Sequence, residues 1–281
     1  MRLVRYGDAG KEKPGLLDAQ GAIRDLSGAV ADIDGSALSR DGLAKLRGLK
    51  VDGLPKVSGS PRLGPPLAMP SKLVAIGLNY SDHAKEANQA IPSEPIIFMK
   101  ATSAICGAND AVVLPNGSKK GDWEVELAFA IGTKAKSVSE ADALGYVAGY
   151  LICNDVSERE WQLERGPTWD KGKGFDTFAP LGPWLVTADE IRNPQNLAMW
   201  LDVNDKRMQT GNTSTMIFGV KKLVSYISQC MTLLPGDVVT TGTPPGVGLG
   251  VKPNPVFLKP GDSMRLGIDG LGEQRQQVTG G

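Results

Sequence analysis

The acidic residues of DWEVELAFAIG, residues 122–132, have types and spacing that could bind a metal. Alternate side chains of a β-strand share a face, so Asp122, Glu124 and Glu126 would lie together on one face, which two alanines continue. Aspartate and glutamate are mostly solvated, and a half-exposed strand with its polar side in water is one interpretation. The small alanines favour the other interpretation, in which the acidic face enters the protein. Two close carboxylates that are buried need a cation.

Asp155 is a third candidate ligand. It follows Asn154 at the end of YVAGYLIC, a continuous apolar run that predicts a strand buried on both faces. A carboxylate at the mouth of such a strand is well placed for a site. With Glu158 three positions later, Asp155 also fits a helix N-cap with a capping residue at N3. The segment by itself leaves both interpretations open.

The segment NYSDHAKEA carries the single histidine of the chain, His83. Ser81 or Asp82 could cap a short helix here, which would place His83 and Glu86 one turn apart on one face. An imidazole oriented by a carboxylate is a general base that can deprotonate water near neutral pH. A surface helix with an incidental pair is the alternative.

Two glycine-rich loops could contact a substrate. KGKGFDTFAPLGPW places Lys171 and Lys173 among glycines, where a lysine could reach an anion, although a flexible surface turn has the same composition. TTGTPPGVGLG, residues 240–250, lacks the GK[ST] of a phosphate loop and the GxGxxG of a dinucleotide site. The chain has no GxSxG and no HExxH motif, so the serine-hydrolase and zincin classes are also excluded.

Composition restricts the metal and the partners. A single histidine and three scattered cysteines cannot supply a nitrogen and sulfur zinc site within one chain. A catalytic metal must then have mainly oxygen ligands, which selects a hard ion such as Mg²⁺, Mn²⁺ or Ca²⁺. The 31 Lys and Arg balance 31 Asp and Glu, so we expect no nucleic-acid and no membrane partner. The N-terminus lacks the apolar region of a signal peptide, which predicts a cytoplasmic protein.

A small N-terminal domain and a larger catalytic domain are expected to position these groups. Residues 1 to about 55 show β-hairpin signals and then a helical stretch, SALSRDGLAKLRGL. The Pro/Gly/Ser-rich PKVSGSPRLGPPLAMP predicts a boundary between domains 1–65 and 70–281. The second domain shows many strands and four helices, in SDHAKEAN, SEADALG, SEREWQLER and MIFGVKKLVSYISQCM. Because strands and helices do not alternate, a β-rich α+β fold is favoured over a Rossmann or TIM arrangement.

Together these segments resemble the fumarylacetoacetate hydrolase family from about Lys72 to about Gly267. GLNYSDHAKE resembles its lid, EPIIFMK its substrate-side strand, DWEVELAFAIG its Glu-x-Glu strand, NDVSEREWQ its aspartate and glutamine segment, KGKGFDTFAPLGP its lysine loop and TTGTPPGVG its threonine loop. The family fold is a mixed β-roll or β-sandwich catalytic domain, commonly a homodimer, with a small β-rich N-terminal domain in this subgroup. The resemblance implies that Glu124, Glu126 and Asp155 are metal ligands and that His83, Glu86 and Lys173 are catalytic. It implies substrate contacts for Lys100, Gln162 and Thr243.

The same resemblance implies one Mg²⁺ or Mn²⁺ per active site and a 2-keto or 2,4-diketo acid substrate. We expect His83, oriented by Glu86, to take a proton from water that attacks the distal carbonyl, so that a carbon–carbon bond is hydrolysed and pyruvate enolate leaves. The subgroup that the chain resembles acts on 2,4-diketo-3-deoxy-L-rhamnonate or L-fuconate, gives pyruvate and L-lactate, and is often labelled ureidoglycolate lyase. Oxaloacetate decarboxylase, ureidoglycolate lyase and dienoate isomerase or hydratase are the alternatives, since all use the same metal and enolate.

Overall fold

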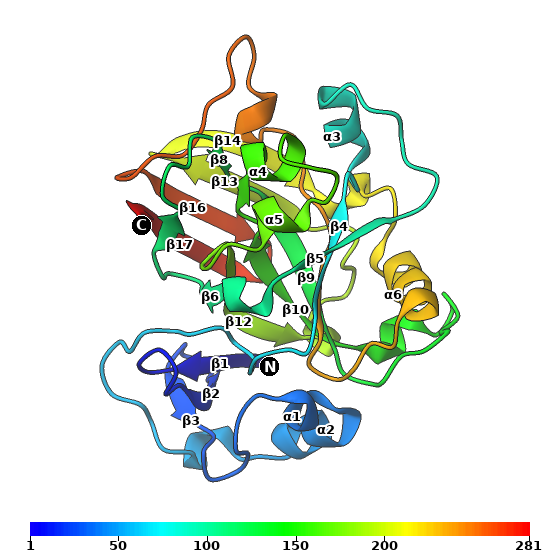
Figure 1. The fold of residues 1–281 in the computed structure, drawn as a ribbon. Helices are drawn as coiled ribbons and strands as arrows, with labels where there is room; N and C mark the ends of the chain where they lie inside the picture. The colour runs from blue at the N-terminus through cyan, green and yellow to red at the C-terminus, as the bar shows by residue number, and fades with distance from the viewer.

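Two β-sheets that pack against each other form the frame of the protein, and the computed structural model describes all of residues 1–281 (Figure 1). The larger sheet has ten strands, in the spatial order β3 (Ile23–Asp25), β2 (Lys13–Leu17), β1 (Arg2–Tyr6), β12 (Ala179–Thr187), β10 (Val147–Asn154), β9 (Val125–Ile131), β15 (Val238–Thr240), β4 (Leu73–Gly77) and β5 (Ile96–Lys100), with β6 (Ile105–Gly107) beside β12. The smaller sheet has five, in the order β14 (Lys206–Asn212), β13 (Ala198–Val203), β16 (Ser263–Ile268), β17 (Gly272–Gly280) and β7 (Val112–Leu114). A separate two-stranded ladder joins β8 (Gly121–Asp122) to β11 (Ser157–Glu158). The expected β-rich α+β fold class is confirmed.

Helices are few and mostly short. They are α1 (Gly35–Leu38), α2 (Arg40–Arg47), α3 (Ser81–Glu86), α4 (Arg159–Leu163), α5 (Asp170–Lys173) and α6 (Val220–Cys230), with 3₁₀ turns η1 (Val51–Gly53), η2 (Thr102–Ala104), η3 (Ala143–Tyr146), η4 (Ala188–Glu190), η5 (Thr213–Thr215) and η6 (Gly248–Gly250). None of these helices combines the length and the apolar character that crossing a membrane requires.

Several local predictions need correction. The helical stretch of the N-terminal segment is split at Ser39, whose backbone is extended and whose hydroxyl accepts the Gly42 N–H at 3.0 Å to cap α2. The helix expected over SEADALG is wrong, because only η3 forms there. Helix α3 begins after Tyr80 and no side chain caps it, so the expected cap by Ser81 or Asp82 is also wrong.

The N-terminal segment extends the large sheet. Strand β1 pairs antiparallel with β12, with Leu3 opposite Leu185, and β2 and β3 follow at the sheet edge. Arg62 adds a polar link, since its guanidinium contacts Glu12 at 2.8 Å and Asp110 at 2.6 Å. Figure 1 shows this segment, with α1 and α2, at the end of the molecule away from α3. The proposed division into domains 1–65 and 70–281 stays a prediction.

The pairing of β9 with β10 positions the acidic residues. The two strands are antiparallel and buried along their whole length, with Val125 opposite Asn154 and Glu126 opposite Cys153. Apolar side chains therefore cover both faces of this strand pair, and its polar residues gather at one end. Asp155, the first residue after β10, arrives at the same end as the start of β9.

Candidate active site

Three carboxylates converge at this end of the β9–β10 pair. Glu124 and Glu126 come from the start of β9 and Asp155 from the end of β10, and their oxygen atoms can lie within 4.8 Å of one another. All three residues are buried, with between 1% and 6% of their surface exposed. The backbone N–H of Asp155 donates to the carbonyl of Glu124 at 2.9 Å, which fixes the two segments relative to each other. The half-exposed interpretation of this strand is therefore wrong.

Three cationic side chains contact the carboxylates unevenly: Lys173, Arg159 and, on Asp155 alone, Lys100. The Lys173 Nζ lies 2.9 Å from Glu124 and 2.8 Å from Asp155, and the Arg159 guanidinium lies 2.7 Å from Glu124. Burial alone would raise the pKa of Glu124, but Lys173 and Arg159 outweigh it and lower that pKa to about 2. Burial, together with the neighbouring carboxylates of Asp155 and Glu124, raises the pKa of Glu126 well above its usual value. Without a cation beside it, the protonated form of Glu126 is therefore favoured.

Lys173 reaches the cluster from the buried side of a short helix, α5, rather than from a flexible turn. Helix α5 packs on α4 so closely that a Cβ at Gly172 would collide with the backbone of Glu158 and Gln162. The glycines of KGKG therefore permit a tight helix contact, and the flexible-turn interpretation of this loop is wrong. Lys171 lies on the exposed side of the same helix.

Asp155 does not cap a helix. Glu158 takes the N-cap position of α4 and accepts the Trp161 N–H at 3.1 Å. The Asp155 carboxylate is instead held by two lysines, because it also accepts from Lys100 Nζ at 2.5 Å. Lys100 is 2% exposed and lies behind Asp155, outside the pocket lining, so the structure does not bring this proposed substrate contact to the pocket.

Asp122 does not continue the acidic face of β9, because the strand is interrupted before Val125. Its carboxylate accepts the N–H groups of Gly248 at 2.6 Å and Leu249 at 3.0 Å, which begin the 3₁₀ turn η6. It also accepts from the Nε of Arg159 at 2.8 Å. Asp122 thus connects the loop of residues 242–251 to α4.

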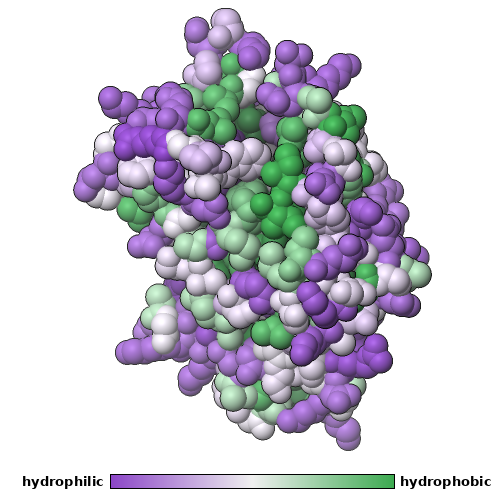
Figure 2. Space-filling view, turned by 45° about the vertical axis from the view of Figure 1, so that its right-hand side comes forward, coloured by the Kyte–Doolittle hydropathy of each residue, from purple (hydrophilic) through white to green (hydrophobic).

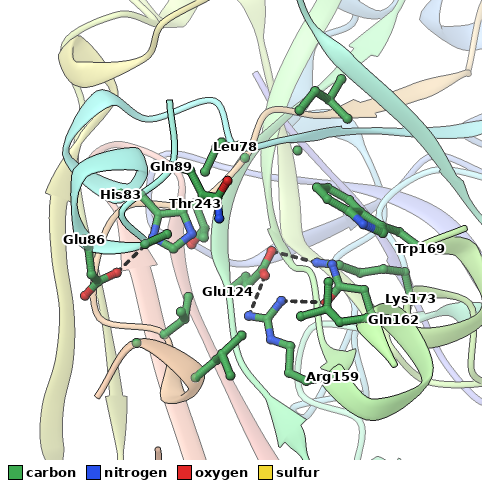
Figure 3. A pocket seen from close by; sticks show the side chains of 18 of the residues that line it. Leu78, His83, Glu86, Gln89, Glu124, Arg159, Gln162, Trp169, Lys173 and Thr243 are labelled. Carbon is green, nitrogen blue, oxygen red and sulfur yellow. Dashed lines mark hydrogen bonds and ion pairs between the residues drawn. The ribbon is translucent and has the colours of Figure 1, made fainter. Parts of the chain in front are cut away.

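A histidine–glutamate pair lies across from the carboxylate cluster. The Nδ1 of His83 is 2.9 Å from one carboxylate oxygen of Glu86, and the other oxygen accepts the Gly246 N–H at 3.0 Å. An ionised Glu86 favours the tautomer with hydrogen on Nδ1, which leaves Nε2 as a proton acceptor. Figure 3 shows the second ring nitrogen of His83 directed away from Glu86, toward the side on which Glu124 lies. His83 and Glu86 therefore lie one helical turn apart, as expected, and their side chains contact each other directly.

His83, Glu86, Glu124, Glu126 and Lys173 line one pocket with a volume of about 600 Å³, and Asp155 lies outside its lining, in contact with Lys173. Figure 3 shows His83 on one side, Lys173 on the other, and Glu124 between them. Gln162 and Thr243, both expected at the substrate, also line the pocket. Pockets of about 300–1,000 Å³ are typical of small-molecule sites, so this one can hold a small organic acid with room for a further substituent.

Arg159 is a pocket residue that the motifs do not single out. Its guanidinium donates to Asp122, to Gln162 at 2.9 Å, and to Glu124. Each of the three guanidinium nitrogens thus has one partner. It lies four positions after Asp155, at the start of α4, and this spacing is the only signal for it in the sequence. Arg159 therefore couples the carboxylate cluster to Gln162 on the pocket wall.

Gln209 is a second residue that sequence reasoning misses. Its amide accepts the Val125 N–H at 2.9 Å and donates to the Thr243 hydroxyl at 2.8 Å, while that hydroxyl donates to the Val125 carbonyl at 2.9 Å. The resulting ring ties Val125, between the two glutamates, to the loop of residues 242–251. The only donor of the Thr243 hydroxyl and one of its two acceptor positions are used here, so this hydroxyl can accept one further hydrogen bond but cannot donate to a ligand. Gln209 gives no local signal because it lies in β14, far along the chain.

Replacing Gln209 by leucine is expected to lower the free energy of unfolding by about 1–3 kcal/mol, because buried partners in β9 and in the 242–251 loop lose their hydrogen bonds. Urea unfolding measures this effect. Gln277→Leu is the matched control, since Gln277 is exposed on β17, and its effect should stay within about 0.5 kcal/mol. Equal midpoints for the two variants would contradict the proposed ring.

The chain belongs to the fumarylacetoacetate hydrolase family: the family model described as Fumarylacetoacetate (FAA) hydrolase C-terminal matches residues 72–279. A relative from Burkholderia cenocepacia (strain HI2424), whose name gives no more than hydrolase as its class, is 61% identical over 278 residues, or 99% of each chain. The solved structure of maleylpyruvate hydrolase from Sphingobium sp. SYK-6, in complex with manganese(II) ion and pyruvate, matches with a TM-score of 0.83 and 31% identity over 100% of both chains. A 2-hydroxyhepta-2,4-diene-1,7-dioate isomerase from Mycobacterium marinum matches with a TM-score of 0.74 and 32% identity, over 100% of this chain and 98% of that one. The protein is therefore an enzyme of this family.

Proposed function

We propose that this enzyme hydrolyses the carbon–carbon bond between C3 and C4 of a 2,4-diketo acid, with the help of Mg²⁺ or Mn²⁺. The observation that carries the proposal is the placement of a buried carboxylate cluster and a His–Glu pair around one pocket. A metal site and a general base on one substrate are what hydrolysis of a diketo acid needs. The balanced reaction consumes one water and gives pyruvate and a carboxylic acid.

The donor set fits a hard divalent cation. Glu124, Glu126 and Asp155 offer only carboxylate oxygens, which Mg²⁺ and Mn²⁺ prefer, and their atoms come within 4.8 Å of one another. A cation at this point would also offset the repulsion that the carboxylates of Asp155 and Glu124 exert on an ionised Glu126. The Mn²⁺ and pyruvate in the maleylpyruvate hydrolase structure support the same choice of metal and product. When bound, the cation supplies Lewis-acid stabilisation of negative charge on the substrate.

His83 is the general base of this proposal. Glu86 holds its Nδ1–H at 2.9 Å, so Nε2 can take a proton from a water molecule that attacks the C4 carbonyl. The C3–C4 bond then breaks, its electron pair remains on C3 as the enolate of pyruvate, and C4 becomes the carboxyl group of the second product. The proton that His83 has taken can be returned to the leaving enolate carbon.

Lys173 and Arg159 provide positive charge on the side of the pocket opposite His83. Both side chains are held by buried carboxylates, and Gln162 is fixed by Arg159 at 2.9 Å. Preorganised donors of this kind stabilise developing negative charge without having to reorient during the reaction. We assign them to the enolate and the carboxylate of the pyruvate half of the substrate.

The finer substrate and the assembly stay predictions. The sequence resemblance favours 2,4-diketo-3-deoxy-L-rhamnonate or L-fuconate, with pyruvate and L-lactate as products. Isomerisation of a dienoate is a second candidate function, favoured by the likeness to the M. marinum isomerase. Oxaloacetate decarboxylation would use the same metal and enolate, and ureidoglycolate cleavage, which breaks a carbon–nitrogen bond, would share only the metal site. A cytoplasmic homodimer is the expected form.

A substrate panel tests the proposed function. Acetylpyruvate, oxaloacetate, a diketo-deoxy sugar acid and a dienoate would each be incubated with the enzyme in Mn²⁺ and in EDTA. Hydrolysis predicts equal amounts of pyruvate and acetate from acetylpyruvate in Mn²⁺, and no turnover in EDTA. Turnover of the dienoate or oxaloacetate alone, with every diketo acid intact, would contradict the proposal.

A further inference from the structure

The pocket has a polar side and an apolar side. The polar side holds Glu124, Glu126, Arg159, Gln162 and Lys173. The apolar side, which we call the apolar wall, consists of the following pocket residues from the ends of β4, β5 and the residue before α5: Leu78, Ile96, Phe98 and Trp169. A ligand whose carboxylate and keto groups occupy the polar side must place its other end near this wall or in solvent.

The apolar wall is a fixed surface. The indole of Trp169 meets the Phe98 ring edge-on with 5.5 Å between centroids, and a Cβ on Gly77 would collide with it, so glycine is needed at that position. Ile96 lies opposite Gly77 in the β4–β5 pair, beside this contact. The Met99 N–H donates to the carboxylate of Asp170 at 3.0 Å, which attaches the start of α5 to β5.

The wall is physically linked to the polar side. Trp169 is the N-cap residue of α5, and the last residue of this one-turn helix is Lys173, whose Nζ contacts Glu124 and Asp155. The same Nζ lies 5.5 Å from the centroid of the Phe98 ring. One short, docked helix therefore presents both the anion-facing lysine and the indole, at a fixed separation.

Few polar groups are free to bind hydroxyl groups near the wall. The Arg159 nitrogens, the Gln162 amide oxygen and the Thr243 hydroxyl already have protein partners, whereas the amide nitrogen of Gln162, on the polar side, has none. The side chains of Gln89 and Lys252 line the pocket without a protein hydrogen bond, and both are exposed. Ile96 and Leu163 carry apolar surface to the pocket mouth, since they are 37% and 48% exposed. Figure 2 shows apolar side chains gathered in the hollowed part of the face that it displays.

We propose that the apolar wall binds the acyl end of the substrate, so that the preferred substrates are acylpyruvates whose acyl group is an apolar chain or ring. This inference rests on the proposed function, because it takes the pyruvate half to lie on the polar side. Each methylene buried against the wall gains about 0.8 kcal/mol of transfer free energy, or about fourfold in kcat/KM, whereas a hydroxyl group buried there without a partner is disfavoured. A polyhydroxylated acyl group is therefore a poorer occupant than an alkyl or phenyl group, so the wall favours a different substrate from the sugar acids that the sequence resemblance favours.

A substrate series tests the proposal. We would measure kcat/KM in Mn²⁺ for acetyl-, butanoyl-, hexanoyl- and benzoylpyruvate, for succinylpyruvate, whose acyl end is a carboxylate, and for 2,4-diketo-3-deoxy-L-rhamnonate. The expected result is a rise of about fourfold per methylene until the wall is covered, and at least about tenfold from acetyl- to hexanoylpyruvate. A flat series, or a preference for the sugar acid or for succinylpyruvate, which Lys252 could bind, would overturn the proposal.

Equilibrium binding separates this inference from the proposed function. In EDTA, where turnover is not expected, calorimetry should give a Kd that falls along the same series. If acetylpyruvate is not hydrolysed in Mn²⁺ but Kd still falls with chain length, the proposed hydrolysis is wrong and the proposed role of the apolar wall is supported. If acetylpyruvate is hydrolysed and neither Kd nor kcat/KM depends on the length of the acyl chain, the proposed role of the apolar wall is wrong and the proposed hydrolysis is supported.

Trp169→Ala connects the selectivity to the wall. The ratio of kcat/KM for hexanoyl- over acetylpyruvate should fall about tenfold, because a buried aromatic ring contributes a large apolar contact area. Trp200→Ala is the matched control: Trp200 lies on β13 in the smaller sheet, packs under Arg207 and Arg265, and does not line the pocket. Its ratio should equal that of the wild type. An unchanged ratio in Trp169→Ala would also overturn the proposal, and the wild-type series keeps the test valid if that variant does not fold.

Discussion

Replacing His83 by alanine is expected to lower kcat for acylpyruvate hydrolysis by about 10²–10⁴-fold, the usual contribution of a positioned general base. His83 is the only histidine of the chain, and its Nδ1 is fixed by Glu86 at 2.9 Å, so no second imidazole can replace it. Binding of Mn²⁺ should remain unchanged, because the three carboxylates belong to other elements. Steady-state kinetics and calorimetric Mn²⁺ titration measure the two effects separately.

The identity of the reaction that survives in His83→Ala is informative. Decarboxylation of oxaloacetate needs no attacking water and should be less affected than hydrolysis by loss of the base. Lys85→Ala is a matched control for damage to α3, since Lys85 is exposed on the same helix and does not line the pocket. Wild-type hydrolysis rates in His83→Ala would remove this residue from the mechanism.

The sequence predicts the parts of the site that depend on local geometry. Alternation along a strand places Glu124 and Glu126 on one face, and one helical turn places His83 beside Glu86; both relations appear in the structure. The end of an apolar run likewise marks Asp155. These relations depend on residues a few positions apart, for which the backbone period determines the outcome.

Relations between distant segments are not contained in local periodicity. Gln209 contacts Val125 and Thr243 only because β14 of the smaller sheet lies near β9 and the 242–251 loop. Strands β14 and β17 are themselves hard to predict, since glutamines take buried positions where apolar residues are usual, as at Gln274 and Gln276. Their amides bond carbonyls of the larger sheet and of the loop after β6, which no alternation rule anticipates.

Tertiary contacts decide between the two interpretations of Asp155 that the sequence leaves open, and they also correct the expected placement of Asp122. Asp155 and Glu158 both have the composition of a helix start, and tertiary ion pairs decide between them, because Lys100 and Lys173 draw the Asp155 carboxylate inward. Glu158 is then left to cap α4. Asp122 leaves the acidic face in a similar way, because the backbone donors of η6 and the guanidinium of Arg159 compete for its carboxylate.

Glu126→Gln and Glu124→Gln are expected to weaken Mn²⁺ binding by more than about 100-fold each, since loss of a direct ligand should exceed the 10–100-fold cost of losing an outer partner. Hydrolysis should fall with it. Their effects on the metal-free fold should differ. Glu124 pairs with Lys173 and Arg159, and its neutralisation removes one of the two carboxylate partners of each of these buried cations. The expected cost is about 3 kcal/mol, at the low end of the range for breaking a buried ion pair, because Asp155 and Asp122 still contact the two cations.

Glu126, in contrast, has no ion pair within 4.0 Å and accepts the Gly242 N–H at 2.8 Å, a bond that the amide oxygen of glutamine can keep. Glu126→Gln should therefore change the free energy of unfolding in EDTA by no more than about 1 kcal/mol, or increase it, because glutamine is neutral and avoids both burying a charge and taking up a proton on folding. Denaturant unfolding in EDTA measures this difference, with Glu164→Gln on the exposed end of α4 as a control that should alter neither Mn²⁺ affinity nor hydrolysis. Wild-type Mn²⁺ affinity in both variants would exclude these carboxylates as ligands. An equal loss of stability in both variants would contradict the inference that Lys173 and Arg159 stabilise the charge of Glu124 more than that of Glu126.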